Sequence, residues 1–265
     1  MRALVTGGAS GIGRGICKAL AAKGRSAGEA VRIAVADLDD GPPMDAVADE
    51  LAALDAQVLR LRADMGTVDG PVSAVRRTVE AFGGLDALVS NAGTAWSRPL
   101  VDYDVADWDR MFAVNTRATW LLAKEAHGAL KASGGSIVII GSISGVYAHM
   151  NLGAYGPSKA AVLMLMQVLA QEFGRDGVRV NAVSPGMVRT GGMTAQVYAD
   201  AQVAAARAAL VPIGRTGEPP DIADVVAFLT SREARYVNGH NLITDGGLGG
   251  NHLGRLPGLG SIQRH

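Results

Sequence analysis

Short apolar runs alternate with longer amphipathic segments along almost the whole chain. Seven runs have the length and composition of buried strands. They are residues 3–6, 33–36, 58–61, 85–90, 136–140, 178–183 and 241–244. The segments between them carry a helical periodicity over about ten residues or more. This alternation predicts an α/β fold, with a doubly wound, mostly parallel seven-stranded sheet and helices on both faces.

Two further segments are defined by their composition. Pro42 and Pro43 mark a turn before a helix at about residues 44–54. Residues 249–265 are rich in Gly and Leu and show no period. We expect this C-terminal tail either to be disordered or to dock on a neighbouring subunit. The apolar residues available for docking are Leu253, Leu256, Leu259 and Ile262.

Charge and composition exclude several classes of function. The 265 residues include 25 basic and 25 acidic ones, which gives a net charge of zero and no basic surface for nucleic acid or membrane. No apolar run approaches a membrane span, and the chain enters a strand at once, which leaves no room for a signal peptide. Cys17 is the single cysteine, and the five histidines show no metal-ligand spacing. We expect a cytoplasmic protein without a metal site.

A glycine-rich turn follows the first apolar run. Residues 7–13 read Gly-Gly-Ala-Ser-Gly-Ile-Gly, and a helical pattern begins directly after them. Glycines let the backbone approach a pyrophosphate, and a helix N-terminus presents free N–H groups and the positive end of its dipole. The order of strand, glycine turn and helix favours a dinucleotide site over an ordinary tight turn.

Asp37 ends the second predicted strand. A carboxylate there can accept hydrogen bonds from the ribose hydroxyls of adenosine, and it would repel a 2′-phosphate. Neither Ser10 nor Leu38 is basic, so we expect NAD rather than NADP. Arg14 is the nearby cation that could weaken this argument, and a solvated aspartate at the end of a strand is the alternative interpretation.

Tyr155 and Lys159 lie four residues apart and share one face of a predicted helix. A free phenol loses its proton only near pH 10, but a nearby ammonium favours the phenolate. The pair can therefore act as a general acid and base towards an alcohol or a carbonyl. Ser142 can hydrogen-bond the same substrate oxygen. Most Tyr–Lys pairs at this spacing are surface residues, so this interpretation depends on the accompanying motifs.

Together these motifs resemble those of the short-chain dehydrogenase/reductase family. The matching residues are Thr6 to Gly13, Asn91-Ala92-Gly93, Asn115, Ser142, Tyr155 with Lys159, Pro185-Gly186, the run from Gly214 to Pro219 and the run from Thr244 to Gly247. They cover about residues 2–248, so we expect one catalytic domain over residues 1–248. Compared with this family, residues 25–30 look like an insertion, which predicts a longer surface loop.

The resemblance implies a role for each matching position. Tyr155 would be the catalytic acid and base, Lys159 would lower its pKa and hold the nicotinamide ribose, and Ser142 would orient the substrate oxygen. Asn115 would lie in a distorted helix and hold a water molecule linked to Lys159. The implied cofactor-binding residues are Gly7, Ser10, Gly11, Ile12, Gly13, Asp37, Leu38, Asp64, Met65, Asn91, Ala92, Gly93, Tyr155, Lys159, Pro185, Gly186, Val188 and Thr190.

The resemblance also places a substrate lid at about residues 187–212, with a hinge at Gly191-Gly192 and a helical stretch at 197–210. The residues that we expect to shape the pocket are Val146, His149, Asn151, Met187 and Met193. For His149 a loop position facing water is the alternative. Residues 160–170 form a helix that is apolar almost all round, which predicts contact with a second subunit. In the family the matching helix packs against its own copy, so we expect a homotetramer, with a dimer as the alternative.

The sequence therefore predicts an NAD(H)-dependent oxidoreductase that acts on a secondary alcohol and its ketone. One alternative is a 3-oxoacyl thioester reductase that uses NADPH, against which Asp37 argues. Another is a catalytically idle dinucleotide-binding scaffold, which would not need the serine and tyrosine chemistry. Sugar-nucleotide epimerases share the Tyr–Lys spacing, but they resemble a different glycine spacing and a longer chain.

Overall fold

The computed structural model describes residues 1–191, 194–195 and 197–250. Its centre is a seven-stranded sheet in which every neighbouring pair of strands is parallel, in the order β3-β2-β1-β4-β5-β6-β7. The strands are β1 (Arg2–Thr6), β2 (Arg32–Asp37), β3 (Gln57–Arg62), β4 (Ala87–Ser90), β5 (Ser136–Ile140), β6 (Arg179–Pro185) and β7 (Asn241–Thr244). The predicted α/β sheet is confirmed.

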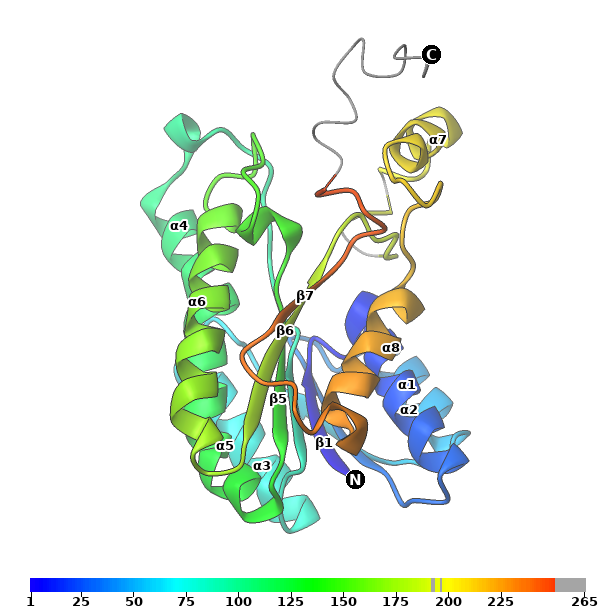
Figure 1. The fold of residues 1–265 in the computed structure, drawn as a ribbon, viewed down its shortest axis with the longest axis vertical. Coiled ribbons are helices and arrows are strands. Elements are labelled where there is room, and N and C mark those ends of the chain that lie inside the picture. The colour runs from blue at the N-terminus through cyan, green and yellow to red at the C-terminus, as the bar shows by residue number, and fades with distance from the viewer. Residues whose placement is uncertain (192–193, 196, 251–265) are drawn as a thin grey trace, which may run out of the picture.

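Helices cover both faces of the sheet (Figure 1). One layer contains α3 (Asp69–Phe82), α5 (Ala118–Ser133) and α6 (Tyr155–Gly174), with α4 (Val105–Phe112) at its upper end. The other layer contains α1 (Gly11–Ser26), α2 (Pro42–Ala52) and α8 (Pro219–Thr230). Helix α7 (Ala201–Ala209) lies apart, beyond the carboxyl ends of the strands. The short helical turns are Leu100–Asp102, Ala113–Arg117, Ile143–Gly145 and Arg232–Ala234.

The core consists of two apolar clusters, one on each face of the sheet. Successive strand residues point to opposite faces, so Leu4 of β1 packs in one cluster and Val5 in the other. The middle strands are buried on both sides, and all five residues of β5 are buried. Burial on both faces explains why these strands read as continuous apolar runs rather than as alternating ones.

Some boundaries differ from the predicted ones. Helix α1 continues to Ser26, so residues 25 and 26 are helical and the predicted loop at 25–30 is shorter than expected. Gly28 then turns the chain at a φ of +67°. Pro42 and Pro43 lie in the first turn of α2 rather than before it. Proline suits that position because the first N–H groups of a helix have no internal partner.

The strand expected at 85–90 begins only at Ala87, and the Asp86 side chain just before it binds the start of β1. Its carboxylate accepts the Arg2 N–H at 2.7 Å and forms an ion pair with the Arg2 guanidinium. At the other end of β1, Thr6 Oγ1 accepts the N–H groups of Asn91 and Ala92, each at 3.0 Å. This junction fixes the glycine turn after β1 against the end of β4.

Strands β1 and β4 are neighbours in the sheet, and the chain proceeds from them towards opposite edges. In open parallel sheets, ligands bind at the carboxyl ends of the strands, where the order reverses in this way. Most of the predicted site residues follow β1, β2, β4, β5 or β6, so the topology brings them to one edge. Among the described residues, no helix is long and apolar enough to cross a membrane.

Candidate active site

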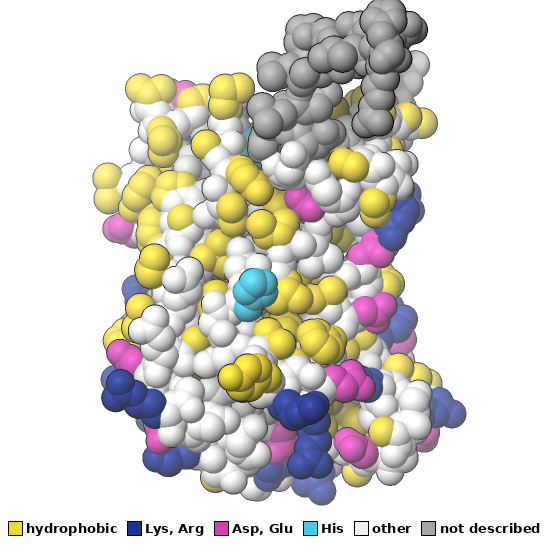
Figure 2. Space-filling view, viewed as in Figure 1, with side chains coloured by type: hydrophobic (Ala, Val, Ile, Leu, Met, Phe, Trp, Pro, Cys, Tyr) yellow, Lys and Arg dark blue, Asp and Glu magenta, His cyan; other side chains and the backbone are white. Residues whose placement is uncertain are grey.

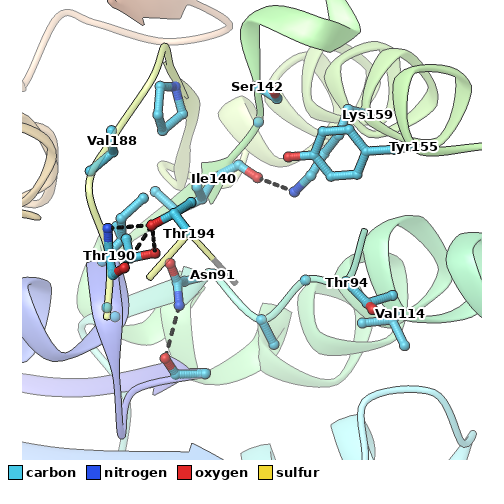
Figure 3. A pocket seen from close by; sticks show the side chains of 18 of the residues that line it. Asn91, Thr94, Val114, Ile140, Ser142, Tyr155, Lys159, Val188, Thr190 and Thr194 are labelled. Carbon is cyan, nitrogen blue, oxygen red and sulfur yellow. Dashed lines mark hydrogen bonds between the residues drawn. The ribbon is translucent and has the colours of Figure 1, made fainter. Parts of the chain in front are cut away.

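A pocket of about 750 Å³ opens at the carboxyl ends of the strands. All the cofactor-binding residues predicted from the sequence line it, from Gly7 and Asp37 at one end to Tyr155 and Thr190 at the other. Figure 3 shows Tyr155 and Lys159 on one side of this pocket, across from Val188, Thr190 and Thr194. Of the predicted catalytic residues, Ser142, Tyr155 and Lys159 line the pocket, and Asn115 lies behind its wall.

The glycine turn has the close geometry that a phosphate cradle needs. Gly7 has a φ of +63°, a conformation that favours glycine. A Cβ atom at Gly13 would overlap the Gly7 carbonyl oxygen, so the first turn of α1 packs directly on the loop. Ser10 is the N-cap residue of α1, and the first turn carries no acidic side chain. The free N–H groups of this helix end therefore face the pocket with nothing to oppose an anion.

Asn91 ties the same turn to β4. Its side-chain amide donates to the carbonyl oxygens of Thr6 and Gly7, at 2.8 and 3.0 Å. With the Thr6 hydroxyl bonds, this closes a network between the two strand ends. The network leaves the glycine loop little freedom, so the shape of the anion site exists before any ligand binds.

The carboxylates of Asp37 and Asp64 also line the pocket, and Asp37 lies beside the glycine turn. Asp37 accepts the N–H of Ala9 at 2.9 Å and that of Leu38 at 2.8 Å. Asp64 forms an ion pair with Arg110 at 2.8 Å and accepts the Gly66 N–H. The hydrogen bond from Arg110 is the main cause that holds the Asp64 pKa below its usual value. Hydrogen bonds thus hold both carboxylates in place.

Two other arginines lie near this end. Arg14 is held by Glu50 through two hydrogen bonds, at 2.9 and 2.7 Å. Arg62 pairs in register with Asp37 across β3 and β2, and its Nε donates to the Leu38 carbonyl oxygen at 3.3 Å. Arg14, the cation that could have favoured a 2′-phosphate, is therefore paired with Glu50. Arg62 forms no ion pair with a described residue.

Ser142, Tyr155 and Lys159 converge from two elements. Ser142 follows β5, and the other two residues lie in the first turns of α6. Ser142 Oγ accepts the Ser144 N–H at 3.1 Å, so the Ser142 hydroxyl proton is available to the Tyr155 oxygen. Burial raises the Tyr155 pKa, and the hydrogen bond with Ser142 lowers it by a smaller amount. We expected Lys159 to lower this pKa, but the net shift is upward and Lys159 is not among its causes.

Lys159 is almost fully buried, which lowers its pKa to about 8. Its ammonium donates to the Ile140 carbonyl oxygen at 2.8 Å and lies 5.8 Å from the centre of the Tyr155 ring. Figure 3 shows this hydrogen bond between Ile140 and Lys159, beside Tyr155. An ammonium has three N–H donors, and among the described residues this is the hydrogen bond that Lys159 donates.

Asn115 lies in a π-helical turn, Ala113–Arg117, between α4 and α5. Such turns break the regular helical hydrogen bonding and often occur at functional sites. The Asn115 side chain exchanges hydrogen bonds with the backbone of Thr94, each at 2.9 Å, and donates to Ser158 Oγ at 3.0 Å. A Cβ atom at Gly93 would lie 3.3 Å from Asn115 Oδ1 and 3.5 Å from Lys159 Nζ. Gly93 therefore keeps a narrow space open between these two side chains.

The substrate end of the pocket agrees only in part with the sequence prediction. His149 and Met187 line the pocket, but Val146 and Asn151 do not. Both belong to the loop after β5 and are exposed, Val146 by 43% of its surface. His149 Nδ1 lies 3.3 Å from Ser144 Oγ, so it faces the site rather than water alone. Met193 and the tail residues 251–265 lie outside the described residues.

The helix in the segment predicted to be a lid is shorter than the predicted stretch at 197–210. Asp200 caps α7 by accepting the N–H groups of Gln202 and Val203, and the helix runs from Ala201 to Ala209. Near the start of the same segment, the hydroxyl of Thr194 accepts the Thr190 N–H at 2.8 Å and donates to the Thr190 carbonyl oxygen at 2.6 Å.

Several further residues line the pocket but belong to no sequence motif, so they were not predicted. They are Ala63, Thr94, Trp96, Arg110, Val114, Ile140, Gly141, Ile143, Ser144, Leu152, Thr194, Tyr198 and Arg207. Ile140 and Gly141 continue β5 towards Ser142, a signal that could have identified them. Within the described part of the chain, no group of three or more potential ligand side chains could hold a metal ion.

Comparison with known proteins agrees with this geometry. Residues 7–249 match the family described as enoyl-(acyl carrier protein) reductase. The chain is 36% identical over 252 residues to 2-(S)-hydroxypropyl-CoM dehydrogenase 3 of Xanthobacter autotrophicus, covering 92% of this chain and 94% of the relative. It is 38% identical over 259 residues to (3R)-3-hydroxyacyl-CoA dehydrogenase of Mus musculus, covering 93% and 95%.

Solved structures show the same fold. A short-chain type dehydrogenase/reductase of Mycobacterium marinum aligns with a TM-score of 0.83 at 30% identity, covering 93% of this chain and 94% of its own. The active-site complex of Pseudomonas aeruginosa RhlG with NADP aligns with a TM-score of 0.84 at 31% identity, covering 93% and 95%. The chain belongs to the short-chain dehydrogenase/reductase family, whose members use an NAD(P) cofactor to oxidise alcohols or reduce ketones.

Proposed function

We propose that this protein is an NAD(H)-dependent oxidoreductase of a secondary alcohol and its ketone. The observation that carries the proposal is the shape of one continuous pocket. It begins at the glycine turn and Asp37 and ends where Ser142, Tyr155 and Lys159 converge. The glycine loop and the α1 N-terminus fit a pyrophosphate, and Asp37 fits the ribose of adenosine.

The bound nicotinamide supplies the hydride acceptor in oxidation and the hydride donor in reduction. Tyr155 takes the proton of the substrate hydroxyl in oxidation and returns a proton to the carbonyl oxygen in reduction. Ser142 donates a hydrogen bond to the same oxygen, which positions it and stabilises the developing charge. The ammonium of Lys159 favours the phenolate, and Asn115 supports the wall behind Lys159.

The preference for NAD rests on the charges around Asp37. Its carboxylate is fixed by two backbone N–H groups, so it cannot turn away from an incoming 2′-phosphate. Arg14 is already bound to Glu50. Arg62 is the residue that opposes this argument, because it pairs in register with Asp37 and forms no ion pair with a described residue. The relative RhlG was solved in complex with NADP, which also argues against a preference for NAD.

A second candidate reaction is the interconversion of a 3-hydroxyacyl and a 3-oxoacyl thioester. One relative carries the name (3R)-3-hydroxyacyl-CoA dehydrogenase, which favours this candidate. The chemistry at Tyr155 would be the same, because the reacting group is again a secondary alcohol. A panel of simple secondary alcohols and 3-hydroxyacyl thioesters, each with NAD and NADP, separates the two by comparing kcat/KM.

We also propose that residues 1–248 work as one catalytic domain, with residues 187–212 as its lid, and that the chain forms an oligomer. Helix α6 leaves Met164 and Val168 exposed by 59% and 44%, and α5 leaves Trp120 exposed by 46%. Figure 2 shows hydrophobic side chains over the middle of the face formed by α6, β7 and α8, with most charged ones towards its lower end and sides. Strand β7 is an edge of the sheet on this face. These surfaces support a homotetramer.

Tyr155→Phe removes the proton-transfer group and keeps the ring that packs over Lys159. We expect kcat/KM for alcohol oxidation to fall about a thousandfold, while cofactor affinity stays within about threefold. The measurement is initial rates with the best alcohol of the panel, together with cofactor titration. Tyr236→Phe, at a fully exposed tyrosine, is the matched control and should leave both unchanged. Near-normal turnover in Tyr155→Phe would contradict the mechanism.

The pH dependence of oxidation should follow the Tyr155–Lys159 pair. Burial lowers the Lys159 pKa to about 8 and raises the Tyr155 pKa, so the first proton leaves the pair near pH 8. Oxidation needs the deprotonated pair, so kcat/KM should rise with pH to a plateau with an apparent pKa of about 8.

In Lys159→Met the first proton must come from Tyr155, so the rise should move above the ordinary phenol pKa of 10. Rates from pH 6 to about 10.5 at saturating cofactor test this. Lys124→Met, at an exposed lysine beside Trp120, is the control and should keep the wild-type profile. An inflection that stays in place in Lys159→Met would show that the pair does not control the reaction.

Asp37→Ser removes the carboxylate that repels a 2′-phosphate. We expect the ratio of kcat/KM with NADP to kcat/KM with NAD to rise about 10- to 100-fold. Asp39→Ser, two residues further along and exposed, is the control. Wild-type protein that already prefers NADP would overturn the cofactor proposal and would point to Arg62 as the phosphate-binding residue.

Light scattering at micromolar concentration tests the oligomer. We expect a mass of four chains, and we expect Met164→Glu to give a smaller species, because it places a charge in the apolar face of α6. Gln202→Glu, on the exposed side of α7, should keep the wild-type mass. A monomeric wild-type protein would refute the proposal.

A further inference from the structure

The lid helix presents a single charged side chain, and it faces the pocket. Eight of the nine residues of α7 are Ala, Val or Gln, and Arg207 is the ninth. Ala204, Arg207 and Ala208 are its half-buried positions, and the other six are exposed. Residues three and four apart share one side of a helix, so these three form the inner side of the lid. Arg207 lines the same pocket as Tyr155.

The guanidinium of Arg207 has no acceptor in the described part of the chain. Its Nε is buried without a hydrogen-bond partner, and no ion pair with a described residue neutralises it. The group is held in place by stacking, since its central carbon lies 5.4 Å from the centre of the Tyr198 ring. Arg207 is half-buried, and burying its Nε without an acceptor is costly, so such an arrangement is expected where a ligand supplies the acceptor.

The pocket itself contains no carboxylate for this role. Its only acidic residues among the described ones are Asp37 and Asp64. Asp64 is bound to Arg110, and Asp37 is bound to backbone N–H groups beside the glycine turn. Arg110 lines the same pocket, but it is paired with Asp64. Of these two arginines, Arg207 is the one that has no acid beside it among the described residues and can pair with an anionic ligand.

The substrate is a more suitable hydrogen-bond acceptor for Arg207 than the cofactor phosphates are. The glycine loop and the N-terminus of α1 already offer N–H groups to the pyrophosphate. Arg207 belongs instead to α7, in the segment that follows Thr190, and Trp96, His149 and Met187 also line the pocket. Among the described lining residues, those that follow β5 and those on the lid include no acidic group.

We infer that Arg207 determines specificity by binding an anionic group of the alcohol substrate, a carboxylate or an equivalent oxyanion such as a sulfonate. This inference rests on the proposed oxidoreductase function and narrows its substrate class to hydroxy acids and related anions. The planar guanidinium offers two parallel donors, which fit the two oxygens of such a group. The reacting hydroxyl lies at Tyr155, so the anion is a second group of the same molecule. Binding it to α7 also links the substrate to the lid.

Ligand binding tests the inference without requiring turnover. The protein loaded with NADH is titrated with propionate, cyclohexanecarboxylate, octanoate and ethanesulfonate, and with the methyl ester of each carboxylate. Calorimetry or the fluorescence of Trp96, which lines the pocket, reports binding. We expect the best anion to bind about tenfold or more tightly than its ester. The variant Arg207→Met should lose this difference, and Arg207→Lys should keep part of it.

The controls separate the possible explanations. Arg235→Met, at an exposed arginine outside the pocket, should bind all ligands as the wild type does. The affinity of Arg207→Met for NADH should stay within about threefold of the wild-type value. Equal binding of anions and esters, no saturable binding of any anion, or a selective loss of NADH affinity in Arg207→Met would each overturn the inference. Failure of the proposed function would instead appear as absent hydride transfer across the alcohol panel, whatever the anions do.

Discussion

A buried ammonium group is the constraint on which the active site depends. Lys159 lies almost fully buried in the first turns of α6, and this burial brings its pKa down to about 8. Its one hydrogen bond within the chain goes to a carbonyl at the end of β5. An amine in this condition gains much from any nearby negative charge. The neighbouring phenol can supply it only as a phenolate, which burial by itself disfavours, so the proposed mechanism depends on the two groups sharing one buried site.

The surrounding fold maintains this electrostatic situation. The π-helical turn at Ala113–Arg117 places Asn115 behind the lysine, and Gly93 leaves a narrow space between them. Ser142 Oγ accepts the Ser144 N–H, which leaves its hydroxyl proton for Tyr155 in the chain alone and, in the proposed mechanism, for the substrate oxygen. These groups come from segments far apart in the sequence, and the parallel sheet brings them together because all its strands end at one edge.

Local sequence signals predicted the features that are themselves local. The seven strands, the glycine turn and the helix after it follow from short patterns, and their order in the chain was enough for the fold. Helix ends were less predictable. Prolines at 42 and 43 read as a turn but fit the first turn of α2, and residues 25 and 26 continue α1. In each case the deciding factor is backbone hydrogen bonding at a terminus, which the pattern of side chains does not encode.

The charges of the pocket were the part that the sequence could not reveal. Nothing in the spacing of Asp64 and Arg110 indicates that they pair, and nothing separates Arg110 from Arg207 until the fold shows which has an acid beside it. The pocket is thereby divided into two regions. Near the glycine turn, acidic side chains and helix N–H groups are proposed to bind the cofactor. Near α7, a cation with no acid beside it is proposed to bind the anionic group of the substrate. Closure of the proposed lid would remove water from that cation, so the anion that pairs with it would contribute most in the closed state. Recognition of the substrate and closure of the site are then one event.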